Sequence, residues 1–215
     1  LESGRRTNPA TFCTGVHSMK KPSDYYYNNV IKSIKLIENL RLSSISKIIF
    51  SSTASVYGGT DGSMVTENSA LSPESPYSNT KLSIEMAIKD FCHAYSMKGI
   101  SLRYFNPIGA DPKMRSGPDN KNPSHVIGKL SEASQTSNSE FNVTGSEWPT
   151  RDGTGIRDYI HVWDVALAHV KAVQNFDQIV TDGNPYSVIN IGSGEGTTVL
   201  ELLSAFEEVA GIKIK

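Results

Sequence analysis

The chain has 215 residues, of which 38% are hydrophobic and 20% charged, and its formal net charge at pH 7 is −1. This composition is that of an ordinary globular protein, and it lacks the excess of lysine and arginine that marks a nucleic-acid-binding protein. No apolar run reaches the ~20 residues that a membrane-spanning helix needs. We therefore expect a cytoplasmic protein whose partner is a small molecule, with no nucleic acid and no membrane bound.

Two cysteines, Cys13 and Cys92, are too few for a disulfide framework and lack the spacing of metal ligands. The histidines are scattered along the chain, so we expect no metal site. The N-terminal segment has no apolar core of the kind that a secretory signal carries.

Helical and strand patterns alternate from the start. Residues 22–42 carry apolar side chains at a helical period, with Ser23 and Asp24 as candidate N-caps. Residues 47–53 (KIIFSST) form a short β-branched run, typical of a strand buried on both faces. A polar loop with several glycines follows over residues 58–75.

The next helix is predicted to begin at Ser75, a good N-cap followed by proline at the first helical position, and to continue to about Tyr95. Residues 99–107 have the pattern of another strand. Residues 110–124 are rich in proline, glycine and polar residues, and we expect them to be irregular.

The remainder of the chain continues the alternation. Helices are predicted over 125–136 and 162–176, strands over 140–145 and 186–193, and a last helix at the capping box that Thr198 opens. Strands separated by helices predict an α/β fold with a parallel sheet and helices on both of its faces.

Tyr77 and Lys81 stand four residues apart at the start of a predicted helix, so they share one helix face. A lysine ammonium there favours the tyrosinate and lowers the phenol pKa from its usual value of ~10. Such a tyrosine can take a proton from a sugar hydroxyl near neutral pH. Among nine tyrosines this spacing also arises by chance, so it does not establish catalysis alone.

Thr53 supplies the context, because it ends the predicted strand and precedes a turn of small residues. Ligands of parallel α/β sheets bind beyond the carboxyl ends of the strands. Taken singly, a threonine here is more often a strand-end cap. Together with Tyr77 and Lys81, it forms a hydroxyl, phenol and ammonium set that predicts a catalytic site.

Four segments then carry a family resemblance: FSSTASVYG, SPYSNTK, RYFNPIGA and RDGTGIRDYIHVWDVALAH. In order and spacing they resemble the signatures of the UDP-glucose 4-epimerase (UDP-galactose 4-epimerase) family of extended short-chain dehydrogenases, over residues from about 16 to 215. The most specific block is GTGIRDYIHV, because the wider superfamily does not share it in that form.

The resemblance implies a domain organisation. We expect a Rossmann-like doubly wound parallel sheet, incomplete here, with part of a smaller substrate-binding lobe. Residues 15–109 would be the remainder of an NAD-binding domain. Residues 110–215 would form a mixed substrate-binding lobe with returning Rossmann elements, and residues 1–14 are unmatched. A homodimer is expected for the complete protein.

The resemblance also implies a mechanism, the interconversion of UDP-galactose and UDP-glucose. NAD⁺ oxidises C4 of the UDP-hexose while Tyr77 takes the 4-hydroxyl proton, the 4-keto sugar turns over, and it is reduced on its other face. Lys81 lowers the Tyr77 pKa and holds the nicotinamide ribose. Thr53 contacts both the cofactor and the sugar hydroxyl, and it helps to relay the proton.

Further residues match family positions by resemblance. Asn28 and Phe105 match cofactor contacts, although a helix-start amide and a core aromatic are the plainer interpretations. Arg157 would clamp the diphosphate with its planar fork, unless it forms a surface ion pair with Asp158. The other expected substrate contacts are Asn106, His125, Val126, Asn142 and Thr144.

The resemblance fails at both ends. A dinucleotide fold opens with a Gly-rich turn that holds the pyrophosphate, in this family G-x-x-G-x-x-G, and the sequence has no such motif. Cys13 stands where the family carries a cofactor-contacting lysine, and a second diphosphate arginine is missing after residue 215. We therefore expect a fragment that lacks the Gly-rich loop and the C-terminal end, with weak or no NAD⁺ binding and little activity.

Two alternatives stay open. Another nucleotide-sugar short-chain dehydrogenase, such as a UDP-N-acetylhexosamine 4-epimerase, fits the same residues. A dehydratase is disfavoured, because Ala54 and Ser55 follow Thr53 in place of an acidic pair. An inactive remnant or binding module is the second alternative.

Overall fold

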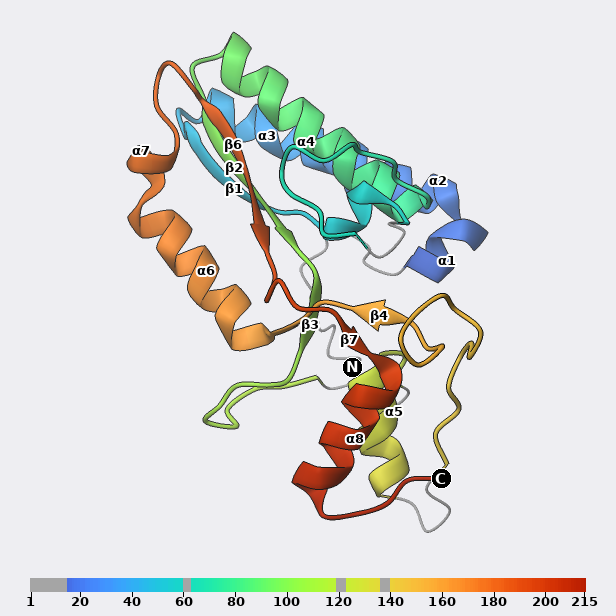
Figure 1. Cartoon of the computed structure of the whole chain (residues 1–215). Helices are drawn as coiled ribbons and strands as arrows, with labels where there is room; N and C mark the ends of the chain where they lie inside the picture. Colours follow the sequence, from blue (N-terminus) through green and yellow to red (C-terminus); the bar gives the residue numbers. More distant parts are fainter. Residues whose placement is uncertain (1–14, 60–62, 119–122, 136–139) are drawn as a thin grey trace, which may run out of the picture. The chain divides into compact units, whose positions relative to one another are not determined.

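The computed structural model describes residues 15–59, 63–118, 123–135 and 140–215 (Figure 1). The chain divides into two compact units. The first consists of Leu1–Tyr104 and Ala168–Ile191, and the second of Phe105–Leu167 and Gly192–Lys215. Each unit is therefore built from two separate stretches of sequence.

A parallel sheet forms the centre of the first unit. Its described strands are β1 (Lys47–Ser51), β2 (Lys98–Tyr104) and β6 (Tyr186–Ile191), in the order β1-β2-β6. Ser51 of β1 lies opposite Leu102 of β2. The predicted parallel sheet is confirmed, and the strand predicted over 99–107 ends earlier, at Tyr104.

Helices cover both faces of this sheet, as predicted (Figure 1). On one face lie α3 (Lys32–Leu42) and α4 (Pro76–Ala94), and on the other α6 (Val162–Gln174) and α7 (Phe176–Ile179). The buried residues are Ile37, Ile84, Ile88, Cys92 and Met97 on the first face and Ile100, Leu102, Ala172, Phe176 and Val180 on the second.

The first helical stretch is less regular than its sequence pattern predicted. After α1 (Gly15–Lys20), α2 (Pro22–Tyr25) leads into the π-helical turn η1 (Tyr26–Ile31) and then into α3. The helix begins at Pro22, so the prediction that Ser23 and Asp24 act as N-caps is wrong. Proline fits there because its fixed φ suits the first helical position, where no N–H is needed.

Helix α4 begins after the predicted N-cap Ser75, and the structure adds a full capping box there. The Ser75 hydroxyl accepts a hydrogen bond from the Ser78 N–H at 3.2 Å, and the Ser78 hydroxyl accepts one from the Ser75 N–H at 3.0 Å. These bonds satisfy two of the backbone N–H groups that have no hydrogen-bond partner within the helix at its N-terminus. The cap thereby fixes where the turn that carries Tyr77 begins.

We expect Ser75→Ala to lower the free energy of unfolding by about 1 kcal/mol, because the cap is lost. Urea denaturation measures this change. The matched control is Ser83→Ala in the middle of α4, whose hydroxyl donates to the Asn79 carbonyl at 2.8 Å. We expect its effect to stay within about 0.5 kcal/mol, and equal losses in both variants would contradict a capping role.

In the second unit, α5 (Val126–Ser134) and α8 (Val199–Ala210) pack around a buried cluster, and short strands pair beside them. Strand β3 (Asn106–Ile108) pairs in parallel with β5 (Tyr159–His161). The antiparallel partners are β4 (Ile156–Arg157) and β7 (Thr197–Thr198). The buried members of the cluster are Leu130, Ala133 and Ile214.

The strand predicted over 140–145 is wrong. These residues form a loop, in which the Phe141 N–H donates to the Lys215 carbonyl at 2.8 Å. The Phe141 side chain packs against the cluster around Leu130. The apolar character of Phe141 therefore reflects burial against helices, and among the described residues no strand pairs with this loop.

Helix α8 also begins with the predicted capping box, between Thr198 and Glu201. Arg151 forms an ion pair with Glu201 and donates to the Gly196 carbonyl at 2.7 Å. The hydrogen bonds from Arg151 and from the Thr198 N–H lower the pKa of Glu201 from 4.5 to about 2. The charged carboxylate is thus favoured in the folded protein.

This pKa predicts a pH-dependent contribution to stability. A carboxylate whose folded pKa is lowered stabilises the fold above its unfolded pKa, and that stability is lost as pH falls toward the folded value. We expect the difference in Tm between wild type and Glu201→Gln to shrink from pH 6 to pH 2. Arg151→Leu should flatten the pH dependence in the same way, and an unchanged difference would contradict the assignment.

Candidate active site

Tyr77 and Lys81 lie on one face at the start of α4, as their spacing predicted. The Lys81 ammonium is 5.9 Å from the centroid of the Tyr77 ring and 4.9 Å from that of Phe50. Lys81 is only 4% exposed, and its Nζ donates to the Ser51 carbonyl at 2.9 Å. A buried cation is thus held between the tyrosine and the end of β1.

Thr53 follows that strand end and caps the short 3-10 helix η2 (Ala54–Tyr57). Its Oγ1 accepts from the Ser55 N–H at 3.2 Å and lies 2.7 Å from the Ser55 hydroxyl oxygen. The side chain is 8% exposed. The threonine therefore has the cap role that is common at strand ends, in the strand-end position that the sequence indicated.

The first turn of α4 is anchored by two side chains that the sequence did not single out. The Ser18 hydroxyl accepts from the Tyr77 N–H at 3.2 Å, and Asn29 Nδ2 donates to Thr80 Oγ1 at 3.0 Å. Thr80 in turn donates to the Tyr77 carbonyl at 2.7 Å. Both anchors are fully buried, so the backbone of Tyr77 is held from two sides.

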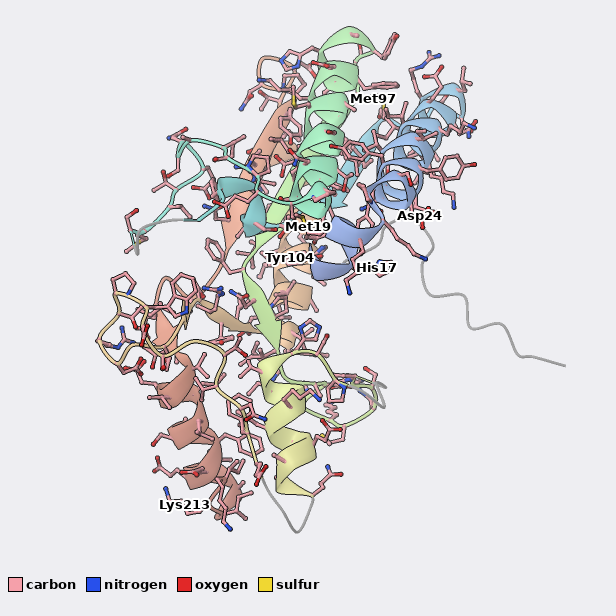
Figure 2. The ribbon with its side chains drawn as sticks, turned by 90° about the vertical axis from the view of Figure 1, so that its right-hand side faces the viewer. His17, Met19, Asp24, Met97, Tyr104 and Lys213 are labelled. Atoms are coloured by element: carbon pink, nitrogen blue, oxygen red, sulfur yellow. The ribbon has the colours of Figure 1, made fainter. Side chains whose placement is uncertain are left out.

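Figure 2 labels the two residues on either side of Ser18, one of these anchors. His17 and Met19, which flank Ser18 on α1, lie at the end of the unit where β2 finishes at Tyr104. Met97 lies at the opposite end, beyond the C-terminus of α4. Helix α1 thus sits beside the first turn of α4, the turn that presents Tyr77.

Asn28, the predicted cofactor contact, has its amide bonded within its own helical stretch. Its Nδ2 donates to the Asp24 carbonyl at 2.8 Å, and its Oδ1 accepts from Lys32 Nζ at 2.5 Å. The neighbouring Asn29 is the buried one. Both lie in the π-helical turn, where the wider turn changes which side chains face inward, so helical periodicity could not separate them. The cofactor role of Asn28 stays a prediction.

Two predicted residues of the second unit lie where β3 begins. Asn106 donates to the Asp158 carbonyl through its backbone N–H at 3.1 Å and through Nδ2 at 2.9 Å. Phe105 is half-buried, and a Cβ built on Gly192 would come within 2.9 Å of its ring. Glycine is thus required where residue 192 passes Phe105.

Arg157 is exposed, and its Nη1 donates to the Ile156 carbonyl at 2.7 Å. The Asp158 carboxylate is taken up by Ser193, whose N–H and hydroxyl donate at 2.8 and 2.7 Å, and by the Gly194 N–H at 2.9 Å. Arg157 and Asp158 therefore form no ion pair with each other, and the Arg157 side chain is exposed to solvent.

The remaining predicted contacts occupy two other parts of the second unit. His125 is the exposed N-cap residue of α5, and Val126 is its half-buried first residue. Asn142 and Thr144 are exposed in the loop that follows residue 140. The predicted set thus divides between the units: Asn28, Thr53, Tyr77 and Lys81 lie in the first, and the others in the second.

Comparison with known proteins adds to this geometry. Residues 8–192 match the model of the NAD dependent epimerase/dehydratase family. The chain belongs to this family. Its match includes Tyr77, Lys81 and Thr53, together with the strands and helices that position them.

Individual epimerases of known name are similar over most of the chain. The UDP-glucose 4-epimerase of Bacillus subtilis (strain 168) is 38% identical over 199 residues, which are 92% of this chain and 58% of that protein. UDP-glucose 4-epimerase 2 of Oryza sativa subsp. japonica is 39% identical over 199 residues, 92% of this chain and 48% of that protein. The chain thus spans about half the length of these relatives.

Solved structures agree with the fold. A UDP-glucose-4-epimerase from Stenotrophomonas maltophila, with bound NAD and formylated UDP-arabinopyranose, has a TM-score of 0.87 at 36% identity. The matched region covers 95% of this chain and 60% of that enzyme's chain. The enzyme from Bifidobacterium longum, in complex with NAD+ and UDP, has a TM-score of 0.85 at 35% identity, over 95% of this chain and 61% of its own.

Three further findings concern other chemistry. Within the described ranges, no group of three or more His, Cys, Asp or Glu side chains could hold a metal ion. No helix in the part of the chain that the structure describes is long and apolar enough to cross a membrane. Burial raises the pKa of the Cys92 thiol to about 11, which disfavours a reactive thiolate, and Cys13 lies outside the described residues.

Proposed function

We propose that the protein interconverts UDP-galactose and UDP-glucose by NAD-dependent oxidation at C4, rotation of the 4-keto sugar and reduction on its other face. The observation that carries the proposal is the buried Lys81 ammonium, 5.9 Å from the Tyr77 ring at the end of β1. The names of the relatives and membership of the epimerase/dehydratase family support it.

The residues present fit one end of the cofactor. The buried Lys81 ammonium donates to the Ser51 carbonyl, and a charged hydrogen-bond donor at this position suits the hydroxyls of the nicotinamide ribose. The sequence holds no G-x-x-G-x-x-G to suit the pyrophosphate. NAD⁺, when bound, supplies the oxidising and reducing chemistry at C4 of the sugar.

In this proposal, the protein's own groups move the proton. Tyr77 takes the proton of the 4-hydroxyl as the sugar is oxidised and returns it as the sugar is reduced. Lys81 favours the tyrosinate by its charge. Thr53, at the strand end, holds the sugar hydroxyl and relays its proton.

The second unit would hold the nucleotide. Arg157 is the proposed diphosphate ligand, because its guanidinium is exposed and not taken by Asp158. Asn106 and Phe105 begin the second unit directly after β2, so the chain leads from the sheet into the proposed ligand contacts. Residues proposed to complete the substrate site are His125, Val126, Asn142 and Thr144.

An isotope experiment tests the reaction. UDP-galactose with deuterium at C4 is incubated with the purified chain and NAD⁺ in ordinary water, with the protein in excess, and UDP-glucose is analysed by mass spectrometry. We expect slow conversion that depends on NAD⁺, with deuterium retained at C4. A reaction that removed the C4 hydrogen as a proton would exchange the label with water.

The outcomes are distinct. Loss of the label during conversion would contradict oxidation and reduction at C4. Absence of conversion although calorimetry shows binding of both NAD⁺ and UDP-galactose would contradict the enzyme and favour a binding module.

A further inference from the structure

A buried ion pair lies beyond the catalytic residues on the same face of α4. Glu85 follows Lys81 by one helical turn, and Arg103 stands on β2; each is only 3% exposed. Arg103 Nη2 donates to Glu85 Oε2 at 2.5 Å, and its Nε donates to Oε1 at 3.0 Å. Burial by itself lowers the pKa of Arg103, but its hydrogen bonds to Glu85 and Tyr57 outweigh burial and raise the pKa.

Stability alone does not account for such a pair. Removing two charges from water costs about as much as their attraction returns, and apolar residues of similar size often serve as well. The proposed mechanism uses neither residue. The other hydrogen bonds of Glu85 and Arg103 indicate a further role for the pair.

Their remaining hydrogen bonds go to one short segment, residues 52–57. The Ser52 hydroxyl donates to Glu85 Oε1, at the start of this segment. At its end, Arg103 Nη1 donates to the Tyr57 hydroxyl at 2.9 Å, with the guanidinium carbon 5.0 Å from the Tyr57 ring centroid. Tyr57 donates onward to Asn190 Oδ1 at 2.7 Å.

Thr53 lies inside this segment. Lys81 and Glu85, one turn apart on α4, contact Ser51 and Ser52, the two residues that directly precede Thr53. After the segment comes Gly58, with φ +76°, where a Cβ would come within 2.2 Å of the Ser72 carbonyl oxygen. The threonine is thus enclosed between two fixed ends.

We propose that the Glu85–Arg103 ion pair positions Thr53 by holding segment 52–57 at both ends. The importance of that position for turnover rests on the proposed function, but the positioning itself does not. Glu85 and Arg103 act through Ser52 and Tyr57, so they are positioning residues.

Two variants each cut one link and leave the ion pair in place: Ser52→Ala and Tyr57→Phe. The reporters are the amides of Ser55, bonded to Thr53 Oγ1 at 3.2 Å, and of Gly58, bonded to the Ser55 carbonyl at 3.4 Å. We expect hydrogen exchange at both amides to rise about tenfold or more, because a hydrogen bond to a buried charged group is lost. Amides of β2 should keep their rates.

The matched control is Ser101→Ala. Ser101 is fully buried on β2, on the same strand face as Arg103, and its hydroxyl accepts from Tyr186 at 2.8 Å, away from segment 52–57. We expect no change at Ser55 and Gly58 in this variant. Thermal unfolding of all three variants shows that each remains folded, and either of the two test variants suffices if the other does not fold.

Unchanged exchange at Ser55 in the test variants would overturn the proposal, and so would an equal rise across β1 and β2. Kinetics then separate it from the proposed function. Where wild type converts UDP-galactose, both variants should lower kcat about tenfold with KM unchanged, the pattern of a transition-state effect. If wild type converts nothing, the proposed function fails while the exchange result still decides the positioning.

Discussion

Tyr77→Phe is expected to lower the conversion of UDP-galactose by about 10²–10⁴-fold, the usual contribution of a general acid–base group. The phenol oxygen is the only atom removed, so the ring keeps its place beside Lys81. Binding of the UDP-sugar should change little, because the variant loses the proposed proton transfer and keeps every other group of the proposed site. Turnover under single-turnover conditions and calorimetric binding of UDP-galactose measure the two effects separately.

The control for this prediction is Tyr95→Phe, at the opposite end of α4. Tyr95 packs its ring edge-on against Phe91, with the Arg41 guanidinium carbon 4.7 Å from its centroid, and both contacts survive without the hydroxyl. We expect wild-type conversion in this variant. A loss in Tyr95→Phe equal to that in Tyr77→Phe would show that removal of any phenol from this helix disturbs the fold, and Tyr77 would then have no catalytic role.

Glu85→Ala is expected to lower the free energy of unfolding by about 3–5 kcal/mol, because it leaves the Arg103 charge buried without its partner. Domains are stable by only about 5–15 kcal/mol in total, so the variant would be close to unfolding at room temperature. The midpoint of urea denaturation measures the loss. Arg103→Met should cost a similar amount for the reciprocal reason.

Two comparisons test the physical reason. The double variant Glu85→Leu/Arg103→Met removes both charges, and we expect it to be more stable than Glu85→Ala. Glu132→Ala breaks a surface ion pair, in which the Glu132 side chain is 43% and the Lys129 side chain 50% exposed. We expect this variant to lower the free energy of unfolding by less than about 1 kcal/mol. Additive losses in the double variant would contradict an uncompensated buried charge as the cause.

Elements with strong local signals were predicted from the sequence. Strands β1, β2 and β6 are apolar runs buried in a parallel sheet. Helix α4 begins after the predicted N-cap Ser75, and α8 begins at the predicted capping box of Thr198. The strands β4 and β7 have only two residues each, too few to show a period. They exist because two distant segments pair, which no local pattern reveals.

In the candidate site, too, local features could be predicted and long-range contacts could not. The spacing of Tyr77 and Lys81 follows from helix geometry, whereas the bond from Asn29 to Thr80 joins residues 51 positions apart and depends on the π-helical turn. Glu85 could have been found, because it extends the four-residue series of Tyr77 and Lys81 by another turn. A carboxylate on a buried helix face beside a basic residue of the next strand is a signal for such a pair.

The discontinuous units bear on how the chain folds as it is made. Strand β2 lies between β1 and β6, yet the stretch Phe105–Leu167 of the second unit is synthesised before β6 leaves the ribosome. Until then, one edge of β2 has no strand to receive its N–H and C=O groups, and an open strand edge invites pairing with other chains. A nascent chain that halts before residue 186 would therefore be a substrate for chaperones, and its aggregation would depend on the speed of translation through residues 105–185.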